Sequence, residues 1–366
     1  MVFRSARVHA LVLSLLWLAV PSSARAEVYG GIEIGAKGIR AIAVDVTKDG
    51  DPKILMVKNE NTTLVADLAV TKQYAPKALE DTATIVGHLA ETLRSEFKLT
   101  DKRLHVMGSS GLFVGLDGDE KLIEKNKEAL IDAIRKKSGV TMDFVTVVRE
   151  AELTIVSVVP RAHSADAVLL DIGSGNTKGG GEKAGMLMTF SLAFGTVSFS
   201  DRVKQEAGKA SFVETAAALR ETLLAPGLSK TLEGKSELAK RNHVYLAGGS
   251  VWALTTFMKP LDRRPYVPLT PRDFEAFHKF LLDHPAELPN PELGAGGDED
   301  RKAALNDLNK VRQTFSRDQL VGGVEILKAL SKAFELEGKD KQIVFARNAY
   351  IGWILGYTVE KGNVAR

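Results

Sequence analysis

Two short segments, one in each half of the chain, combine an acidic residue with an apolar strand and a glycine-containing turn. The first is 32–38 and carries Glu33, and the second is 170–176 and carries Asp171. Packing does not explain these acids, because an unpartnered carboxylate is costly to bury. The turn glycines let backbone N–H groups converge on an anion. One such turn alone would most often be only a turn, but the repeat predicts two phosphate-binding turns that grip a phosphate chain from both sides of a cleft.

The residues of the two turns are the candidate phosphate ligands. They are Gly35, Ala36, Lys37 and Gly38 in the first turn, and Gly173, Ser174, Gly175, Asn176, Thr177 and Lys178 in the second. The two lysines have two interpretations, which the sequence does not separate. They could bind a phosphate chain directly, or they could be ordinary solvated turn residues.

The elements that position these turns follow the alternation of an α/β domain. In the first half we expect strands at 28–34, 39–46, 53–57, 104–107 and 144–148, with helices at 84–97 and 121–137. In the second half we expect strands at 167–172, 186–190, 243–247 and 342–346, and helices from 251, at 272–283, at 316–336 and at 348–359. The stretch 289–300 has the Gly and Pro content of a loop.

The first 26 residues have the pattern of a secretory signal. Arg4 and Arg7 precede an apolar run at 10–20. A segment of mostly small residues follows and ends at Ala26 with the A-x-A pattern of a cleavage site. A membrane anchor is the alternative, but a membrane span needs roughly 20 apolar residues and this run is about half as long. We therefore expect cleavage after Ala26, a periplasmic or secreted location, and no membrane association afterwards.

Composition excludes several other classes of protein. The leader takes three of the 49 basic residues and none of the 46 acidic ones, so the rest of the chain is neutral and carries no sign of nucleic-acid binding. Cysteine is absent, which excludes disulfides and thiolate metal sites. The seven histidines show no metal-ligand spacing, so each is expected to be an ordinary surface or core residue.

Several segments together resemble the exopolyphosphatase/guanosine pentaphosphate phosphohydrolase family (Ppx/GppA), a branch of the actin, sugar-kinase and Hsp70 superfamily. The segment 169–177 resembles the second phosphate loop of that family. Similar segments are 149–153, which resembles "EEARL", 190–198, which resembles "SLPMGCVS", and 247–254, which resembles "GTGGTARAL". The segments 267–274 and 316–356 also follow the family's order, so the likeness covers nearly all of the chain after the leader.

The resemblance implies specific roles for residues of this chain. Glu150 matches the hinge glutamate that activates water for attack on the terminal phosphoryl group, although a helix N-terminal acid favoured by the helix dipole is the alternative. Asp171 matches the acid that holds a metal ion or the attacking water. With Glu33 it would bind Mg²⁺, the implied cofactor, and Gly195 and Thr196 would join the phosphate-binding residues.

Five positions depart from the family pattern. Glu33 replaces an aspartate, and Ala36 and Lys37 replace the Ser/Thr and Asn of the first turn. Phe113 stands where an arginine is expected, which removes a bidentate phosphate ligand. Lys178 replaces an acid, and its charge would oppose Mg²⁺ by on the order of several kcal/mol at a few ångström and an effective dielectric near 20.

The resemblance implies an α/β fold with two ribonuclease H-like (actin-like ATPase) lobes and an interlobe cleft. We expect lobe I at 27–152, rejoined by a C-terminal helix at 348–366, and lobe II at 153–347. Two functions remain open. One is a phosphohydrolase that releases terminal phosphate from inorganic polyphosphate or a nucleoside polyphosphate. The other is a degenerate relative that binds a phosphate chain or a protein partner. A filament or chaperone-like role is a further alternative, and a homodimer is possible with any of these functions.

Overall fold

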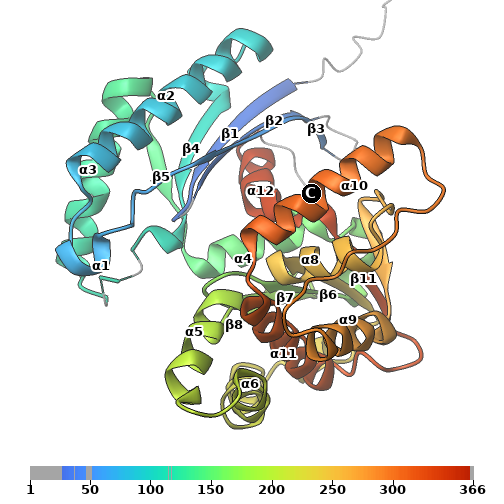
Figure 1. Ribbon diagram of the computed structural model, residues 1–366. Helices are drawn as coiled ribbons and strands as arrows, with labels where there is room; N and C mark the ends of the chain where they lie inside the picture. Colours follow the sequence, from blue (N-terminus) through green and yellow to red (C-terminus); the bar gives the residue numbers. More distant parts are fainter. Residues whose placement is uncertain (1–26, 37, 47–51, 114, 117, 363–366) are drawn as a thin grey trace, which may run out of the picture.

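The computed structural model describes residues 27–362 apart from 37, 47–51, 114 and 117 (Figure 1). The expected leader, 1–26, and Lys37 therefore lie outside the described residues. Within the described part, no helix is both long enough and apolar enough to cross a membrane.

Lobe I contains a five-stranded sheet in the order β3-β2-β1-β4-β5. The first three strands form an antiparallel meander, and β4 and β5 run parallel to β1. The strands are β1 (Glu27–Ile34), β2 (Gly38–Val46), β3 (Lys53–Asn61), β4 (Leu104–Gly108) and β5 (Met142–Phe144).

Lobe II repeats this topology with one added strand. Its sheet has the order β10-β11-β9-β6-β7-β8, in which β6, β7 and β8 form the meander and β9 and β11 are parallel to β6. The strands are β6 (Ala167–Ile172), β7 (Thr177–Lys183), β8 (Met186–Leu192), β9 (His243–Gly248), β10 (Tyr266–Leu269) and β11 (Gln342–Ala346). The same strand order in both sheets confirms the prediction of two ribonuclease H-like lobes.

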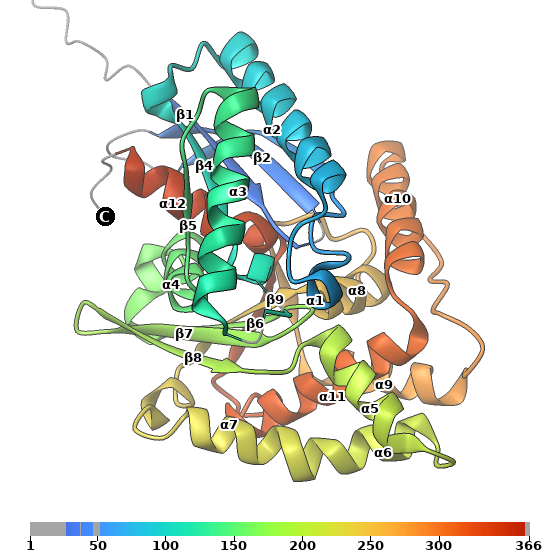
Figure 2. The same cartoon turned by 90° about the vertical axis from the view of Figure 1, so that its left-hand side faces the viewer.

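Each sheet is covered by helices on both faces. Figures 1 and 2 show α2 and α3 side by side over one face of the lobe I sheet, with α12 against the other face. These helices and the one at the lobe junction are α2 (Pro76–Phe97), α3 (Glu120–Ser138), α4 (Val147–Val158) and α12 (Gly352–Lys361). The short helix α1 (Leu68–Thr71) precedes α2. Thus the last helix of the chain completes the core of the first lobe.

Helices also surround the lobe II sheet. They are α5 (Thr196–Ala207), α6 (Phe212–Leu219), the π-helical turn η4 (Arg220–Leu224), α7 (Ala225–Thr231), α8 (Gly249–Met258), α9 (Pro271–Asp283), α10 (Asp298–Thr314) and α11 (Arg317–Ala333). Figure 2 shows α5, α6 and α7 following one another along the outer side of this lobe.

Strand alternation explains why both acids turn toward the middle of the molecule. Side chains of a strand point alternately to its two faces. Ile32 and Ile34 pack in the core under α2 and α3, so Glu33 between them points to the α12 face. Leu170 and Ile172 pack in the outer core of lobe II, so Asp171 shares the face of Leu169, which packs with α4 residues.

Helices α4 and α12 cross at close range between the lobes. The crossing depends on glycine, because a Cβ at Gly356 would collide with the carbonyl of Leu153, and one at Gly352 would lie 2.8 Å from the Thr154 methyl carbon. The Ser157 hydroxyl also donates to the Gly352 carbonyl at 2.6 Å. This contact joins the end of lobe I's chain to the helix that leads into lobe II.

The predicted strand at 144–148 is wrong after its first residue. β5 ends at Phe144, and α4 begins at Val147. The β-branched run favoured a strand, but the Thr146 side chain caps the helix by accepting the Arg149 N–H at 3.2 Å. The sequence prediction also missed β7, β10 and the helices α5 to α7 and α10, the last of which begins within the stretch assigned to a loop.

Candidate functional site

Glu33 and Arg40 form a cross-strand pair at the end of lobe I's first hairpin. They are partners in the β1–β2 register, and Arg40 Nη1 lies 2.9 Å from both Glu33 Oε1 and Oε2. The Glu33 carboxylate is buried. It raises the pKa of the Arg40 guanidinium, against the opposite effect of burial. Both oxygens of this acid are therefore occupied by a cation of its own lobe.

Glu150 lies near the start of α4 and is also buried. Its Oε1 accepts the Ser110 backbone N–H at 2.7 Å, and its Oε2 accepts the Lys178 ammonium at 2.8 Å. Ser110 belongs to lobe I and Lys178 to lobe II. The predicted hinge glutamate thus connects the two lobes through one carboxylate.

Lys178 and Asp171 are cross-strand partners on β6 and β7. Burial raises the pKa of Asp171, and Glu150 adds to this, while Lys178 and Arg40 lower it. Burial opposes the charge of Lys178, but Glu150, Asp171 and Glu33 outweigh that effect and raise the pKa of the lysine. Lys178 is therefore an ammonium in direct contact with one carboxylate, Glu150, and under the influence of two others. We call the following residues the interlobe site: Glu33, Arg40, Ser110, Glu150, Asp171 and Lys178.

The second turn is fastened to the start of α5. Gly173 accepts the Thr196 N–H at 2.8 Å, and Ser174 accepts the Val197 N–H at 2.9 Å. The first amides of α5 are therefore used within the protein. Among the described residues, the backbone N–H groups of Ser174 and Gly175 have no acceptor, and they remain available to an anion.

Two predicted phosphate ligands of this region have other partners. The buried Thr177 hydroxyl donates to the Phe194 carbonyl at 2.8 Å, and the buried Thr196 hydroxyl lies 3.2 Å from the Ser250 hydroxyl. The structure thus gives both threonines a place in the framework of the loop. Their predicted contact with phosphate stays a prediction.

The first turn is closed by a hydrogen bond from the Gly35 N–H to the Gly38 carbonyl at 2.8 Å. It lies against the segment that carries Ser110, because a Cβ at Gly111 would be 3.7 Å from the Ala36 Cβ. Lys37 lies outside the described residues. The Phe113 ring packs 5.3 Å from that of Phe144.

The N-terminus of α8 lies where β6 ends. Gly248 precedes the helix with φ +99°, and a Cβ there would collide with the Ile172 carbonyl. Only glycine permits this approach. The close approach of Gly248 to Ile172 places the N-terminus of α8, the positive end of its dipole, beside the second turn. This helix end has no side-chain cap.

Sequence reasoning missed Arg40 and Ser110. Arg40 could have been found, since a tight turn at 35–38 places it opposite Glu33 in an antiparallel pair. Ser110 acts through its backbone N–H, which no side-chain pattern reveals.

The residues present do not fit the implied Mg²⁺. That ion takes octahedral oxygen coordination, usually from one or two carboxylates with water and phosphate. Here Arg40 takes both oxygens of Glu33, and Ser110 and Lys178 take those of Glu150. Asp171, the other expected ligand, lies opposite Lys178 on the neighbouring strand and is under the influence of its positive charge.

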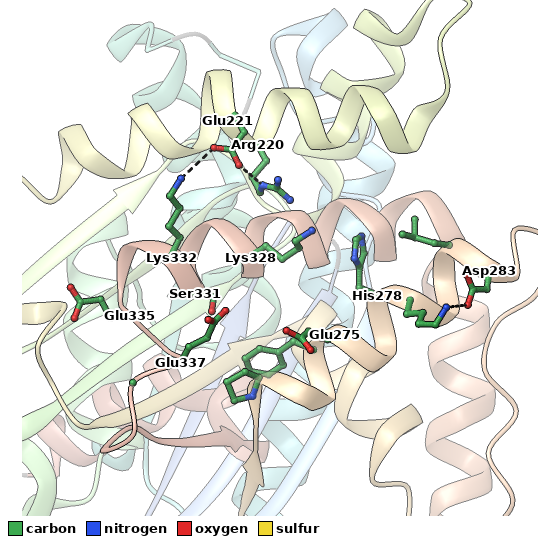
Figure 3. A pocket seen from close by; sticks show the side chains of 15 residues that line it. Arg220, Glu221, Glu275, His278, Asp283, Lys328, Ser331, Lys332, Glu335 and Glu337 are labelled. Carbon is green, nitrogen blue, oxygen red and sulfur yellow. Dashed lines mark hydrogen bonds and ion pairs between the residues drawn. The ribbon is translucent and has the colours of Figure 1, made fainter.

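A large cavity lies elsewhere, on the outer side of lobe II (Figure 3). It measures about 770 Å³ and is lined by η4, α9 and α11, and none of its lining residues belongs to the interlobe site. Its wall carries side chains of both charges, some of which are paired with each other in Figure 3, such as Lys332 with Glu221. Size alone therefore does not mark this cavity as the place of the phosphate chemistry.

Comparison with known proteins supports the fold. No protein-family model matches the chain, and no curated protein matches it. Among solved structures, the Aquifex aeolicus Ppx/GppA family member is similar, with a TM-score of 0.62, 17% identity, and 92% of this chain and 98% of that one covered. A Cytophaga hutchinsonii exopolyphosphatase has a TM-score of 0.63 at 16% identity, covering 93% of this chain and 100% of the other. The predicted resemblance is therefore confirmed at the level of the fold.

Proposed function

We propose that the interlobe site binds a chain of phosphate groups and that the protein is a phosphohydrolase of the exopolyphosphatase type. One observation carries the proposal: the buried Glu150 carboxylate lies where both lobes and the two turns meet. Water attacks the terminal phosphorus, its new P–O bond forms as the bond to the bridging oxygen breaks, and Glu150 accepts the water's proton. The shortened chain leaves as an anion.

Positive groups around Glu150 would stabilise the charge of the transferring phosphoryl group. Lys178 is one, and the free N–H groups of Ser174 and Gly175 and the α8 N-terminus are others. For Glu150 to act as a base, Lys178 must exchange the carboxylate for a phosphate oxygen. A bound substrate would provide that second anionic partner.

The substrate in this proposal is inorganic polyphosphate or a nucleoside polyphosphate. Similar folds in proteins named exopolyphosphatases support this choice. The signal-like N-terminus supports a periplasmic or secreted protein, and such a location favours polyphosphate over an intracellular nucleotide.

A second candidate is a phosphate-chain binder without catalysis. The observation that favours it is the ion pair between Lys178 and Glu150, at 2.8 Å and almost buried, which occupies an oxygen of the proposed base. While the Lys178 ammonium occupies Glu150 Oε2, this oxygen is not open to a water molecule, so a substrate would have to displace the lysine before Glu150 could act.

The deciding experiment is phosphate release from long-chain polyphosphate by residues 27–366, with Glu150→Gln as the test variant. Glu152→Gln is the matched control, since Glu152 lies on the same helix and pairs with Arg149 rather than Lys178. Release that disappears only in Glu150→Gln supports the hydrolase. Binding without release from any variant supports the binder, and neither binding nor release contradicts both.

A further inference from the structure

Lys178 is largely buried, unlike an ordinary surface lysine. Its side chain is only 12% exposed, and its ammonium lies 2.8 Å from Glu150 Oε2. By strand alternation it shares the face of its partner Asp171, which is directed at α4. Burying a lysine this deeply is unfavourable without anionic partners. Lys178 has one in contact, Glu150, and a second, Asp171, opposite it on the neighbouring strand.

The negative charges of the site are consequently neutralised by basic residues of the same chain. Arg40 neutralises Glu33, and Lys178 neutralises Glu150 while facing Asp171. A divalent ion at this point would have to displace an ammonium from its carboxylate or approach it within a few ångström. Both are opposed by Coulomb repulsion, which is strong at such distances away from bulk water.

We infer that Lys178 is a built-in counter-cation that takes the place of a divalent metal, so that the interlobe site works without one. Its ammonium bridges the lobes through Glu150 in the free protein. With a phosphate chain bound, it would neutralise the phosphate oxygens, and this second role rests on the proposed function. The first role, exclusion of the metal, does not depend on catalysis.

The direct test is Mn²⁺ binding, followed by electron paramagnetic resonance, together with thermal unfolding in Mn²⁺ and in EDTA. Three variants are compared with the unmodified protein: Lys178→Glu, Lys178→Met and the control Lys183→Glu. Lys183 lies on the same strand but is exposed, so its substitution changes the charge without changing the site.

The expected results differ sharply between the proteins. The unmodified protein and Lys183→Glu bind no stoichiometric Mn²⁺, and their Tm is the same in Mn²⁺ and EDTA. Lys178→Glu binds Mn²⁺ at least about a hundredfold more tightly than the unmodified protein, because a carboxylate that attracts the ion replaces an ammonium that repels it. The Tm of this variant rises with Mn²⁺. Lys178→Met, which removes charge but keeps an apolar stem, gains affinity to a smaller extent.

Two results would overturn the inference. One is stoichiometric Mn²⁺ binding by the unmodified protein that Glu150→Gln abolishes. The other is a Lys178→Met or Lys178→Glu protein that binds no better than Lys183→Glu, since the lysine would then not be what excludes the metal. If neither Lys178 variant folds, the test rests on the unmodified protein. Its stoichiometric binding of Mn²⁺ through Glu150 would still overturn the inference.

Polyphosphate binding in EDTA and in Mg²⁺ separates this inference from the proposed function. Equal binding in both supports the inference. Binding that is lost in EDTA contradicts it while leaving the proposed function intact. No binding in either condition contradicts the proposed function, and the Mn²⁺ result then stands on its own.

Discussion

At the scale of single residues, Arg40 and Lys178 each neutralise an acid that the fold has buried. The first pair lies within one hairpin, and the second joins two lobes. A buried ion pair adds little net stability, but removal of one partner leaves an uncompensated charge. These pairs therefore set what the site can bind more than how stable the protein is.

Arg40→Met should lower the free energy of unfolding by about 2 kcal/mol, because the buried Glu33 carboxyl group loses its hydrogen-bonding partner. Urea unfolding measures the effect. The double variant Glu33→Met, Arg40→Met should recover part of the loss, since it removes both charges. A double variant no more stable than the single one would show that the pair is not the cause.

At the scale of helices, Glu325 ties α11 to its neighbours. This buried acid lies 2.5 Å from Arg220 of η4, 3.0 Å from His278 of α9 and 3.6 Å from Lys328 of its own helix. Burial raises the pKa of Glu325, but the hydrogen bond with His278 and the charges of Lys328 and Arg220 outweigh it and hold the pKa below its ordinary value. The ion pairs thus connect the elements that line the lobe II cavity.

The sign of the pH effect follows from this lowered pKa. The unfolded chain binds the proton more readily, so the stabilisation is complete above the ordinary glutamate pKa, about 4.3, and is lost as the pH falls through the lower folded value. Glu325→Gln should therefore be less stable than the unmodified protein at neutral pH, and the difference should shrink in acid. Urea unfolding across this range measures it, and a difference independent of pH would contradict the assignment.

Gly356→Ala tests the crossing of α12 and α4. In a helix this change is ordinarily stabilising by about 0.5–1 kcal/mol, but here the new Cβ collides with the Leu153 carbonyl, so we expect a loss of about 1–3 kcal/mol. Gly322→Ala in α11 is the control, since its Cβ would make only ordinary contacts of 3.5–3.7 Å. The denaturant midpoint should fall in Gly356→Ala and rise in Gly322→Ala. Shifts in the same direction in both variants would contradict the packing argument.

At the scale of the whole molecule, lobe I is assembled from both ends of the described chain. The inner face of its sheet packs Ile42 and Val44 against Ile354 and Leu355 of α12. A protein ending at residue 351 should therefore expose this face and lose the fold of lobe I. Limited proteolysis should then degrade lobe I first, whereas survival of both lobes would contradict this view of the core.

The fold could be predicted from the sequence because its strongest signals are local and occur twice. The strand-acid-turn pattern fixed the position of Glu33 and Asp171, and strand alternation then directs both toward the centre. The partner of Glu150 could not be predicted, since a lysine next to a turn has the same pattern whether it is solvated or buried. Likewise, Val145 to Val148 has the composition of a strand, but the cap at Thr146 starts a helix at Val147.

The position of α12 also determines when the protein can fold. A chain appears from the ribosome with its N-terminus first, so the five strands of lobe I are complete long before α12 exists. During that interval the inner face of the first sheet has no helix to cover it, while the strands of lobe II are all present by Ala346. Lobe I is therefore the last part of the fold whose residues are all present. A permuted chain that begins with α12 would reverse that order.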